Sequence, residues 1–309
     1  LQNAATPTRK YLGLEFTLDG LGLEGIQGLT FQVNDAYLRV NWASEGDRLN
    51  WVAAYENDQS TPVKKIAEFT ELTSDVALQI HGQMELSAFG FVMAYGEFYL
   101  FKGEVEDVND GSIAAFDADV LSIDLRLASV FAGTGGKFIR DGDGEPIGFD
   151  HTKGAVGFYV DNANLSLSIL QNAATPTQKY LGLEFTLDGL GLEGIQGLIL
   201  NIFNCSLMVN WASDGTRLDW ATATINDDAH DKYERLADYD KLTNEVELQI
   251  SGWMDLDLFG FVMAYGGFTL FKGQMDVNDG SYDADAQTGI EPFKADLLSI
   301  SFEQVSLFA

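Results

Sequence analysis

Residues 170–198 read LQNAATPTQKYLGLEFTLDGLGLEGIQGL, and residues 1–29 read the same sequence except that Arg9 stands in place of Gln178. The match continues along the chain, so the sequence contains a tandem duplication. We therefore predict two domains. Residues 1–169 form a complete repeat, and residues 170–309 form a second, truncated copy of it. The simplest interpretation is a piece of a longer array.

Apolar and polar residues alternate in several segments of the repeat, including residues 38–42, 121–128 and 165–169. A period of two predicts β-strands with one buried face. Ile80–Leu86 and Ala94–Leu100 also share a mid-strand glycine, which is typical of a bend or bulge. We predict an all-β fold, an elongated tandem repeat of strongly coiled antiparallel β-sheet modules. Whether these modules form an extended sandwich or a solenoid stays open.

Two connecting segments depart from the strand pattern. Thr61–Phe69 begins with a capping residue, has Pro62 at the first helical position and continues with apolar residues at helical spacing. This pattern predicts a short helix in a connecting loop. The counterpart, Asp228–Leu242, differs in almost every position. Residues 55–75 and 224–244 are thus the variable parts of the repeats.

The composition excludes several classes of protein. A formal net charge of −29 argues against a nucleic-acid partner, because phosphate backbones are bound by basic surfaces. A single cysteine, Cys205, excludes an intrachain disulfide framework. No apolar run approaches the length of a transmembrane helix, so no membrane span is expected in this segment.

Several short segments of the repeat are similar to modules in giant repetitive cell-surface proteins of environmental bacteria. These segments are Gly157–Leu167, Lys179–Leu183, Gly194–Leu198, Val209–Ser213 and Leu218–Trp220. The resemblance implies an extracellular, adhesin-like array of all-β units with adhesive or structural roles. It carries over no catalytic residues.

An acidic, glycine-rich segment near residue 145 is a candidate calcium site. Its carboxylates are Asp141, Asp143, Glu145 and Asp150. Ca²⁺ takes six to eight oxygen ligands, and alternating acidic residues in a loop can supply several of them. The spacing does not match an EF-hand, since Pro146 stands where that loop needs glycine. The alternative is a polar hairpin turn.

A second acidic motif, Asp-Val-Asn-Asp-Gly-Ser, occurs in both repeats. Its candidate calcium ligands are Asp107, Asn109 and Asp110 in the first copy and Asp276, Asn278 and Asp279 in the second. The same residue types form ordinary turns, because Asn, Asp and Gly tolerate positive φ angles. Both interpretations stay open.

Four of the five tryptophans recur in matching pairs. They are Trp42 and Trp211, and Trp51 and Trp220. Their position beside strands of the buried type favours core or module-interface packing over stacking on a carbohydrate. Trp253 replaces Gln83 at an outward position, where we expect it to cover a neighbouring module.

Catalytic motifs are missing from the sequence. The three histidines are far apart, no nucleophile elbow or phosphate-binding loop occurs, and abundant carboxylates make any acid pair uninformative. We therefore expect a non-catalytic structural or adhesive protein of a long extracellular fibre or cell-surface filament, with other copies of itself as partners. The alternative is a Ca²⁺-dependent adhesin that binds a glycan or other surface ligand, and the third is a secreted carboxylate-dependent hydrolase.

Overall fold

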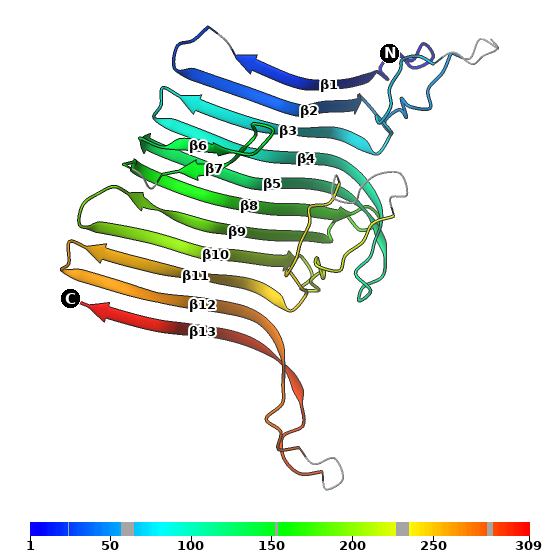
Figure 1. The fold of residues 1–309 in the computed structure, drawn as a ribbon. Coiled ribbons are helices and arrows are strands. Elements are labelled where there is room, and N and C mark those ends of the chain that lie inside the picture. The colour runs from blue at the N-terminus through cyan, green and yellow to red at the C-terminus, as the bar shows by residue number, and fades with distance from the viewer. Residues whose placement is uncertain (24, 57–64, 152–153, 227–234, 283–286) are drawn as a thin grey trace.

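The computed structural model describes all of residues 1–309 except 24, 57–64, 152–153, 227–234 and 283–286. It shows one open antiparallel sheet of eleven strands and a separate two-stranded hairpin (Figure 1). The strands are β1 (Tyr11–Leu23), β2 (Leu29–Ala43), β3 (Val76–Ala88), β4 (Val92–Val108), β5 (Phe116–Thr134), β6 (Lys137–Arg140), β7 (Pro146–Asp150), β8 (Val156–Asn172), β9 (Lys179–Glu193), β10 (Leu198–Ala212), β11 (Val246–Leu258), β12 (Val262–Val277) and β13 (Phe293–Phe308). The predicted all-β antiparallel fold is confirmed.

Strands follow one another in the sheet in chain order, and only the β6–β7 hairpin, between β5 and β8, lies outside it. Strands β9 to β13 of the second repeat correspond in sequence to β1 to β5 of the first. The two strands at the ends of this order, β1 and β13, each have a neighbour on one side only. The N-terminus therefore lies at one edge of the sheet and the C-terminus at the other (Figure 1).

The predicted helix in the connecting loop is not present in the described residues. Residues 61–64 of that segment lie outside the described part of the chain, and Lys65 forms an isolated β-bridge with Tyr55. Phe69 packs its ring against Trp51, with ring centroids 5.3 Å apart. Tertiary packing of the apolar side chain therefore outweighs the weak local preference for helix. The described residues also contain no helix with the length and hydrophobicity that a membrane span requires.

The two faces of the sheet differ in character. We call the face that carries Ser122 and Asp124 of β5 the loop face, and the face that carries Leu121, Ile123 and Leu125 the apolar face. Bulges at single residues with left-handed backbone shift the alternation within strands β2, β5, β8, β10 and β13. These residues are Asp35 (φ 46°), Leu127 (φ 50°), Asn162 (φ 48°), Asn204 (φ 50°) and Gln304 (φ 48°).

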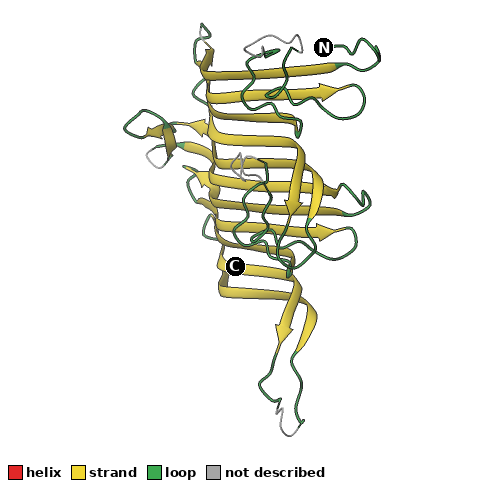
Figure 2. Ribbon diagram, turned by 90° about the vertical axis from the view of Figure 1, so that its right-hand side faces the viewer, coloured by secondary structure: helices red, strands yellow, loops and turns green. Residues whose placement is uncertain are grey.

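Both hydrophobic cores lie on the loop face. The larger core packs long loops against one end of the sheet and includes Phe101 and Val120 of the first repeat and Trp220 and Leu236 of the second. In the smaller core, Phe149 of the β6–β7 hairpin packs with residues of the sheet such as Met93, Tyr95 and Phe131. Figure 2, turned by 90° from Figure 1, shows the hairpin projecting from the sheet.

The apolar face forms rows of hydrophobic residues that cross the repeat boundary. In one row, Leu100 of β4 pairs with Ile123 of β5, Ile123 with Leu167 of β8, and Leu167 with Leu183 of β9. Neither core cluster contains a residue of this row. Surface of this kind is typical of a contact with another protein layer, since monomers rarely expose large apolar patches.

Candidate functional site

The two repeats are joined through the sheet itself. Strand β8 lies between β5 and β9 and pairs with both over most of its length. Leu165 of β8 pairs with Leu125 on one side and with Phe185 on the other. Backbone pairing therefore continues from the first repeat into the second through β8, with local shifts in register at the bulges.

The loop between β10 and β11 crosses back onto the first repeat. Trp220, Leu236 and Leu242 of this loop are almost completely buried in the larger core, which also contains Phe101 and Val120. Burial of large apolar side chains is the main stabilising contribution to such contacts. The two repeats thus share one core.

The Asp-Val-Asn-Asp-Gly-Ser motif of the first repeat binds this loop. Asp110 Oδ2 accepts a hydrogen bond of 2.8 Å from the backbone N–H of Asp219. The backbones of Asn109 and Thr224 exchange two hydrogen bonds, of 3.0 and 2.7 Å. Burial raises the pKa of Asp110, but hydrogen bonds from the amides of Asp219, Ile113 and Ser112 outweigh it and hold the pKa below its ordinary value.

Two further polar contacts fasten the loop. Arg235 forms an ion pair with Asp75, and the backbone N–H of Ala237 donates to Ser122 Oγ at 2.8 Å. Burial raises the pKa of Asp75, yet the neighbouring Thr73 side chain and the charge of Arg235 lower it below the ordinary value. The buried hydroxyl of Ser122 and the N–H of Ala237 satisfy each other.

The other candidate calcium ligands of this motif lie at strand ends or in the turns that follow them. Asp107 has a left-handed backbone (φ 51°), and its N–H donates to Asp117 Oδ1 at 3.1 Å. In the second repeat, Asn278 Oδ1 accepts from Gly280 N at 2.8 Å and Asp279 Oδ1 from Ser281 N at 2.9 Å. Asp276 lies at the end of β12 opposite Lys294.

The candidate carboxylates of the β6–β7 hairpin also belong to a turn or to a strand end. Asp141 Oδ1 accepts hydrogen bonds from the N–H groups of Asp143 (3.0 Å) and Glu145 (2.9 Å), which closes the β6–β7 turn. Asp150 ends β7 opposite Lys137. Among the described residues, no group of three or more His, Cys, Asp and Glu side chains is arranged to hold a metal ion. The calcium site stays a prediction.

The paired tryptophans occupy two different environments. Trp51 and Trp220 are buried, and their Nε1–H groups donate to the Oδ1 atoms of Asn41 (3.0 Å) and Asn210 (3.1 Å). Trp42 and Trp211 instead lie on the apolar face, with 49% and 50% of their surface exposed. Trp253 lies on the loop face.

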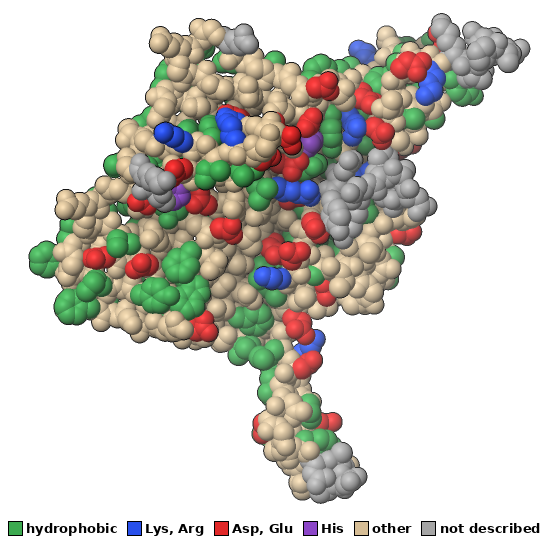
Figure 3. Space-filling view, viewed as in Figure 1, with side chains coloured by type: hydrophobic (Ala, Val, Ile, Leu, Met, Phe, Trp, Pro, Cys, Tyr) green, Lys and Arg blue, Asp and Glu red, His purple; other side chains and the backbone are tan. Residues whose placement is uncertain are grey.

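The ring of Trp253 packs within the second repeat. It stacks with Phe203, with ring centroids 6.3 Å apart, and lies 5.7 Å from Tyr265. Its bulk leaves little room at Gly267, where an added Cβ would be 2.8 Å from the indole. Figure 3 shows hydrophobic side chains clustered at the lower left, over strands of the second repeat, whereas charged side chains are spread more widely over this face.

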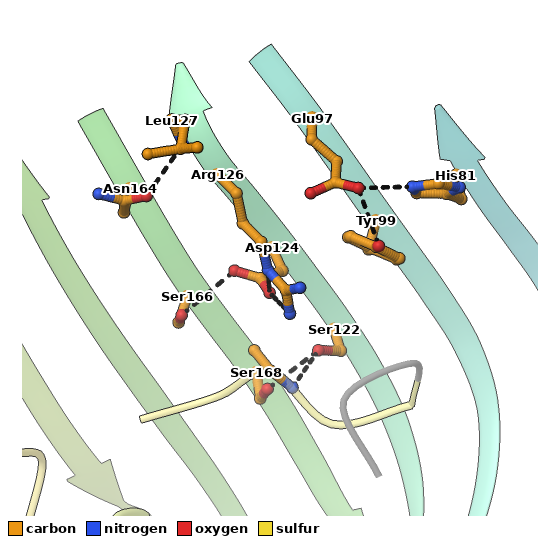
Figure 4. A network of polar contacts seen from close by, with 11 residues as sticks. His81, Glu97, Tyr99, Ser122, Asp124, Arg126, Leu127, Asn164, Ser166 and Ser168 are labelled. Atoms are coloured by element: carbon orange, nitrogen blue, oxygen red, sulfur yellow. Dashed lines mark hydrogen bonds and ion pairs between the residues drawn. The ribbon is translucent and has the colours of Figure 1, made fainter. Parts of the chain in front are cut away.

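A polar network on the loop face of the first repeat was not foreseen from the sequence. His81 Nε2 and Tyr99 Oη each lie 3.0 Å from Glu97 Oε1, and Arg126 Nε donates to Asp124 Oδ2 at 2.8 Å (Figure 4). The ring of Tyr99 lies between the His81 ring, 4.1 Å away, and the Arg126 guanidinium, 4.7 Å away. Aromatic stacking and cation–π attraction thus add to the hydrogen bonds.

The two carboxyl groups of this network differ in their pKa. Burial raises the pKa of Glu97, but hydrogen bonds from His81 and Tyr99 outweigh it and lower the pKa overall. Burial is the stronger effect at Asp124, where the pKa is raised although Arg126 opposes the shift. The network draws on three strands, β3, β4 and β5, so no short sequence motif could have revealed it.

A cavity of about 150 Å³ adjoins the network. Its lining includes Glu97 and Arg126 from the sheet and Glu145 and Pro146 from the β6–β7 turn. The hairpin is held over the sheet by Arg140, whose guanidinium donates two hydrogen bonds, of 2.5 and 2.8 Å, to the carboxylate of Glu85. This bidentate pairing fixes the wall of the cavity.

The second repeat lacks the network. Ser251, Gly267, Thr269, Ser301 and Glu303 stand where the first repeat has His81, Glu97, Tyr99, Asp124 and Arg126. The charged lining is therefore particular to the first repeat, whereas a cavity of about 200 Å³ lined by Ser251, Gly267 and Glu303 lies at the equivalent position of the second. Comparisons with protein-family models, with curated proteins and with solved structures found no match for this chain.

Proposed function

We propose that this chain is part of a structural protein whose repeats join edge to edge into one continuous sheet, in an extracellular fibre or cell-surface filament, and that it has no catalytic role. The observation that carries the proposal is the continuous strand pairing from β5 through β8 to β9. Independent domains are usually joined by linkers with few contacts across the boundary. A joint made of a shared sheet and a shared core gives a fixed geometry instead.

The same joint can recur along an array. The first repeat contributes six strands to the sheet, β1 to β5 and β8, and the truncated second copy contributes five, β9 to β13. Neighbouring strands lie about 4.8 Å apart, so each added repeat lengthens the sheet by about 29 Å. A formal net charge of −29 supports solubility of such an array through self-repulsion.

The test is a three-repeat chain, made by placing a second copy of residues 1–169 directly after the first. We expect solution X-ray scattering to show a particle longer by about 29 Å, and electron micrographs to show a straight, regular rod. The control replaces both copies of β8 with a flexible Gly-Ser linker of the same length. An added length that is the same with the linker, or repeats that tumble independently in both chains, would contradict the proposal.

A second candidate function is binding of a glycan or other surface ligand, with or without Ca²⁺. The polar cavity between Glu97, Arg126 and the β6–β7 turn favours it, because only the first repeat has these side chains. Titration calorimetry with a panel of mono- and oligosaccharides, in calcium and in EGTA, tests this proposal. Binding that is abolished by Arg126→Gln, but not by Glu303→Gln at the counterpart position, would support it.

A further inference from the structure

Strand β13 is the counterpart of β5 and has an unpaired outer edge. In β5, Leu121, Ile123 and Leu125 are shielded on one side by β4 and on the other by β8. Their counterparts in β13 have only β12 beside them. These counterparts are Leu298, Ile300 and Phe302, with exposed fractions of 66%, 58% and 70%. A long unprotected edge of this kind is a template for pairing with another strand.

Three hydrogen-bonding contacts that involve side chains join β5 to β8, in addition to the hydrogen bonds between their backbones. Ser122 Oγ lies 3.2 Å from Ser168 Oγ, and Ser129 Oγ accepts a hydrogen bond of 2.9 Å from the N–H of Asn162. At the bulge, the N–H of Leu127 donates to Asn164 Oδ1 at 2.9 Å. Together these contacts fix the register of β8 against β5, in addition to the hydrophobic pattern.

Strand β13 keeps the β5 side of all three contacts although much of its sequence differs from β5. Ser299 and Ser306 stand at the positions of Ser122 and Ser129. Gln304 stands at the position of Leu127 and has the same left-handed backbone, with φ 48° against 50°. A non-glycine residue in this conformation is uncommon, so its recurrence at a strand edge indicates a retained bulge.

The opposite edge of the sheet shows the same preference. Leu1 and Gln2 repeat the sequence of Leu170 and Gln171 at the end of β8. Gln2 forms a β-bridge with Lys10, just as Gln171 pairs with Lys179 beside β9. The end of a β8-type segment therefore already lies beside β1 in the position that β8 has beside β9.

From these observations we infer that the edge of β13 binds an extended segment of the β8 type, antiparallel and in the register that β8 has on β5. The partner is a strand with serine and asparagine on the loop face and leucine or isoleucine on the apolar face. The inference rests on the proposed function, because an array needs such a strand at every joint. A β1 strand of a second copy fits less well, since the structure places β8 between a β5-type and a β1-type strand.

The experiment uses the full chain and a synthetic peptide with the sequence of Val156–Asn172. We expect the peptide to protect amides of Phe293–Phe308 from hydrogen–deuterium exchange, because their outer hydrogen-bonding groups become paired. The register is tested by disulfide trapping between Ile300→Cys in the chain and Leu167→Cys in the peptide, with Cys205→Ser to remove the native thiol. Directly paired residues of neighbouring strands are close enough for a disulfide.

Two variants on the edge test the recognition features. Ser306→Ala removes the acceptor for the peptide's Asn162 N–H and should weaken binding about three- to ten-fold, the effect of one hydrogen bond. Glu303→Gln is the matched control, because its counterpart Arg126 bonds within the first repeat to Asp124 and not to β8. The control should bind the peptide like the unmodified chain.

No protection of β13, equal protection by a scrambled peptide, or disulfide trapping favoured by Leu165→Cys over Leu167→Cys would overturn the inference. Protection of β1 alone would overturn it as well. Protection of β13 without peptide, in a concentrated sample of the unmodified chain, would identify a second copy of the chain as the occupant. That result would also overturn the inference. The scattering experiment on the three-repeat chain tests the proposed function separately, because the joints of that chain are covalently connected. Absence of peptide binding would therefore leave the proposed function intact.

Discussion

Asp110 shows at the scale of one residue how a turn becomes a joint between repeats. Its carboxylate accepts hydrogen bonds from the N–H groups of Ser112 and Ile113 in its own turn and from Asp219 in the second repeat. Asp279, its counterpart, bonds to Ser281 within its own turn and lies at the surface. Asp110 thus accepts hydrogen bonds from two further backbone N–H groups, those of Ile113 and Asp219, that have no counterpart at Asp279 among the described residues.

We expect Asp110→Ala to lower the free energy of unfolding by about 2 kcal/mol and Asp279→Ala to lower it by clearly less. Both changes remove the bonds to the serine of the turn, and the difference reports the further hydrogen bonds of Asp110, to Asp219 and to Ile113. Urea denaturation of the two variants measures these values. Equal losses would show that the contact between repeats contributes nothing measurable.

Glu184 on the loop face gives a prediction on pH. Burial raises its pKa, although the backbone N–H of Lys241, which donates to Oε2 at 3.2 Å, opposes the shift. A raised pKa in the folded state means that this group favours folding fully below its unfolded pKa, near 4.5, and that this contribution is lost as the pH rises through the folded pKa.

The change in melting temperature caused by Glu184→Gln should therefore be more favourable at pH 7 than at pH 4.5. Glutamine stays neutral at both pH values and keeps an oxygen acceptor. Thermal unfolding at the two pH values measures the change. Other acids titrate in both proteins, so only the difference between variant and unmodified chain is informative. A difference that is independent of pH would contradict the prediction.

At the scale of elements, a glycine in β9 lets the loop between β10 and β11 pack against the sheet. The indole of Trp220 lies over Gly182, where an added Cβ would be only 2.6 Å from the ring. Trp51 lies over Gly13 in the same way in the first repeat. A side chain at either glycine would push the tryptophan out of the larger core.

Gly182→Ala should lower the free energy of unfolding by about 2 kcal/mol through overpacking. Gly189→Ala, in the same strand, is the control, because its Cβ would meet only ordinary contacts at 3.5 Å or more. Calorimetry of both variants gives the comparison. A loss of similar size in the control would attribute the effect to the strand and not to the tryptophan.

Elements differ in how far the sequence predicted them. The alternation of Leu121, Ile123 and Leu125 with polar residues predicted strands because side chains on a strand point to opposite faces. The helix predicted over Thr61–Phe69 is absent from the described residues because a local preference is weak against packing of Phe69 on Trp51. The polar network needed the sheet register, which places His81 opposite Tyr99 and Tyr99 opposite Asp124.

At the scale of the whole molecule, electrostatic repulsion between acidic side chains opposes folding, whereas hydrophobic packing favours it. There are 47 acidic and 18 basic side chains, so folding brings many like charges together. Repulsion between surface charges is long-ranged at low salt and is screened within about 8 Å at physiological ionic strength. Part of the stability of the joint between repeats should therefore depend on salt.

We expect the melting temperature to rise by several degrees between about 10 and 200 mM NaCl, because screening weakens the repulsion in the folded state more than in the expanded chain. Differential scanning calorimetry measures the change, and a sucrose series at equal osmolality is the control. A melting temperature that is constant or falls with salt would mean that attractive ion pairs, such as that between Arg140 and Glu85, outweigh the repulsion.

The sequence alone determined that the chain is duplicated and built of strands, since repetition and a period of two are properties of the residues themselves. It could not determine which strands are buried. Residues 10–23 and 179–192 are identical, yet Leu12, Leu14 and Phe16 of β1 have exposed fractions of 54%, 44% and 51%, while their counterparts in β9 are half-buried. Strand β9 has β8 as a neighbour, whereas β1 is the edge strand and is paired only with β2. The neighbouring strand therefore decides how far each side chain is buried, and only the tertiary structure supplies that neighbour.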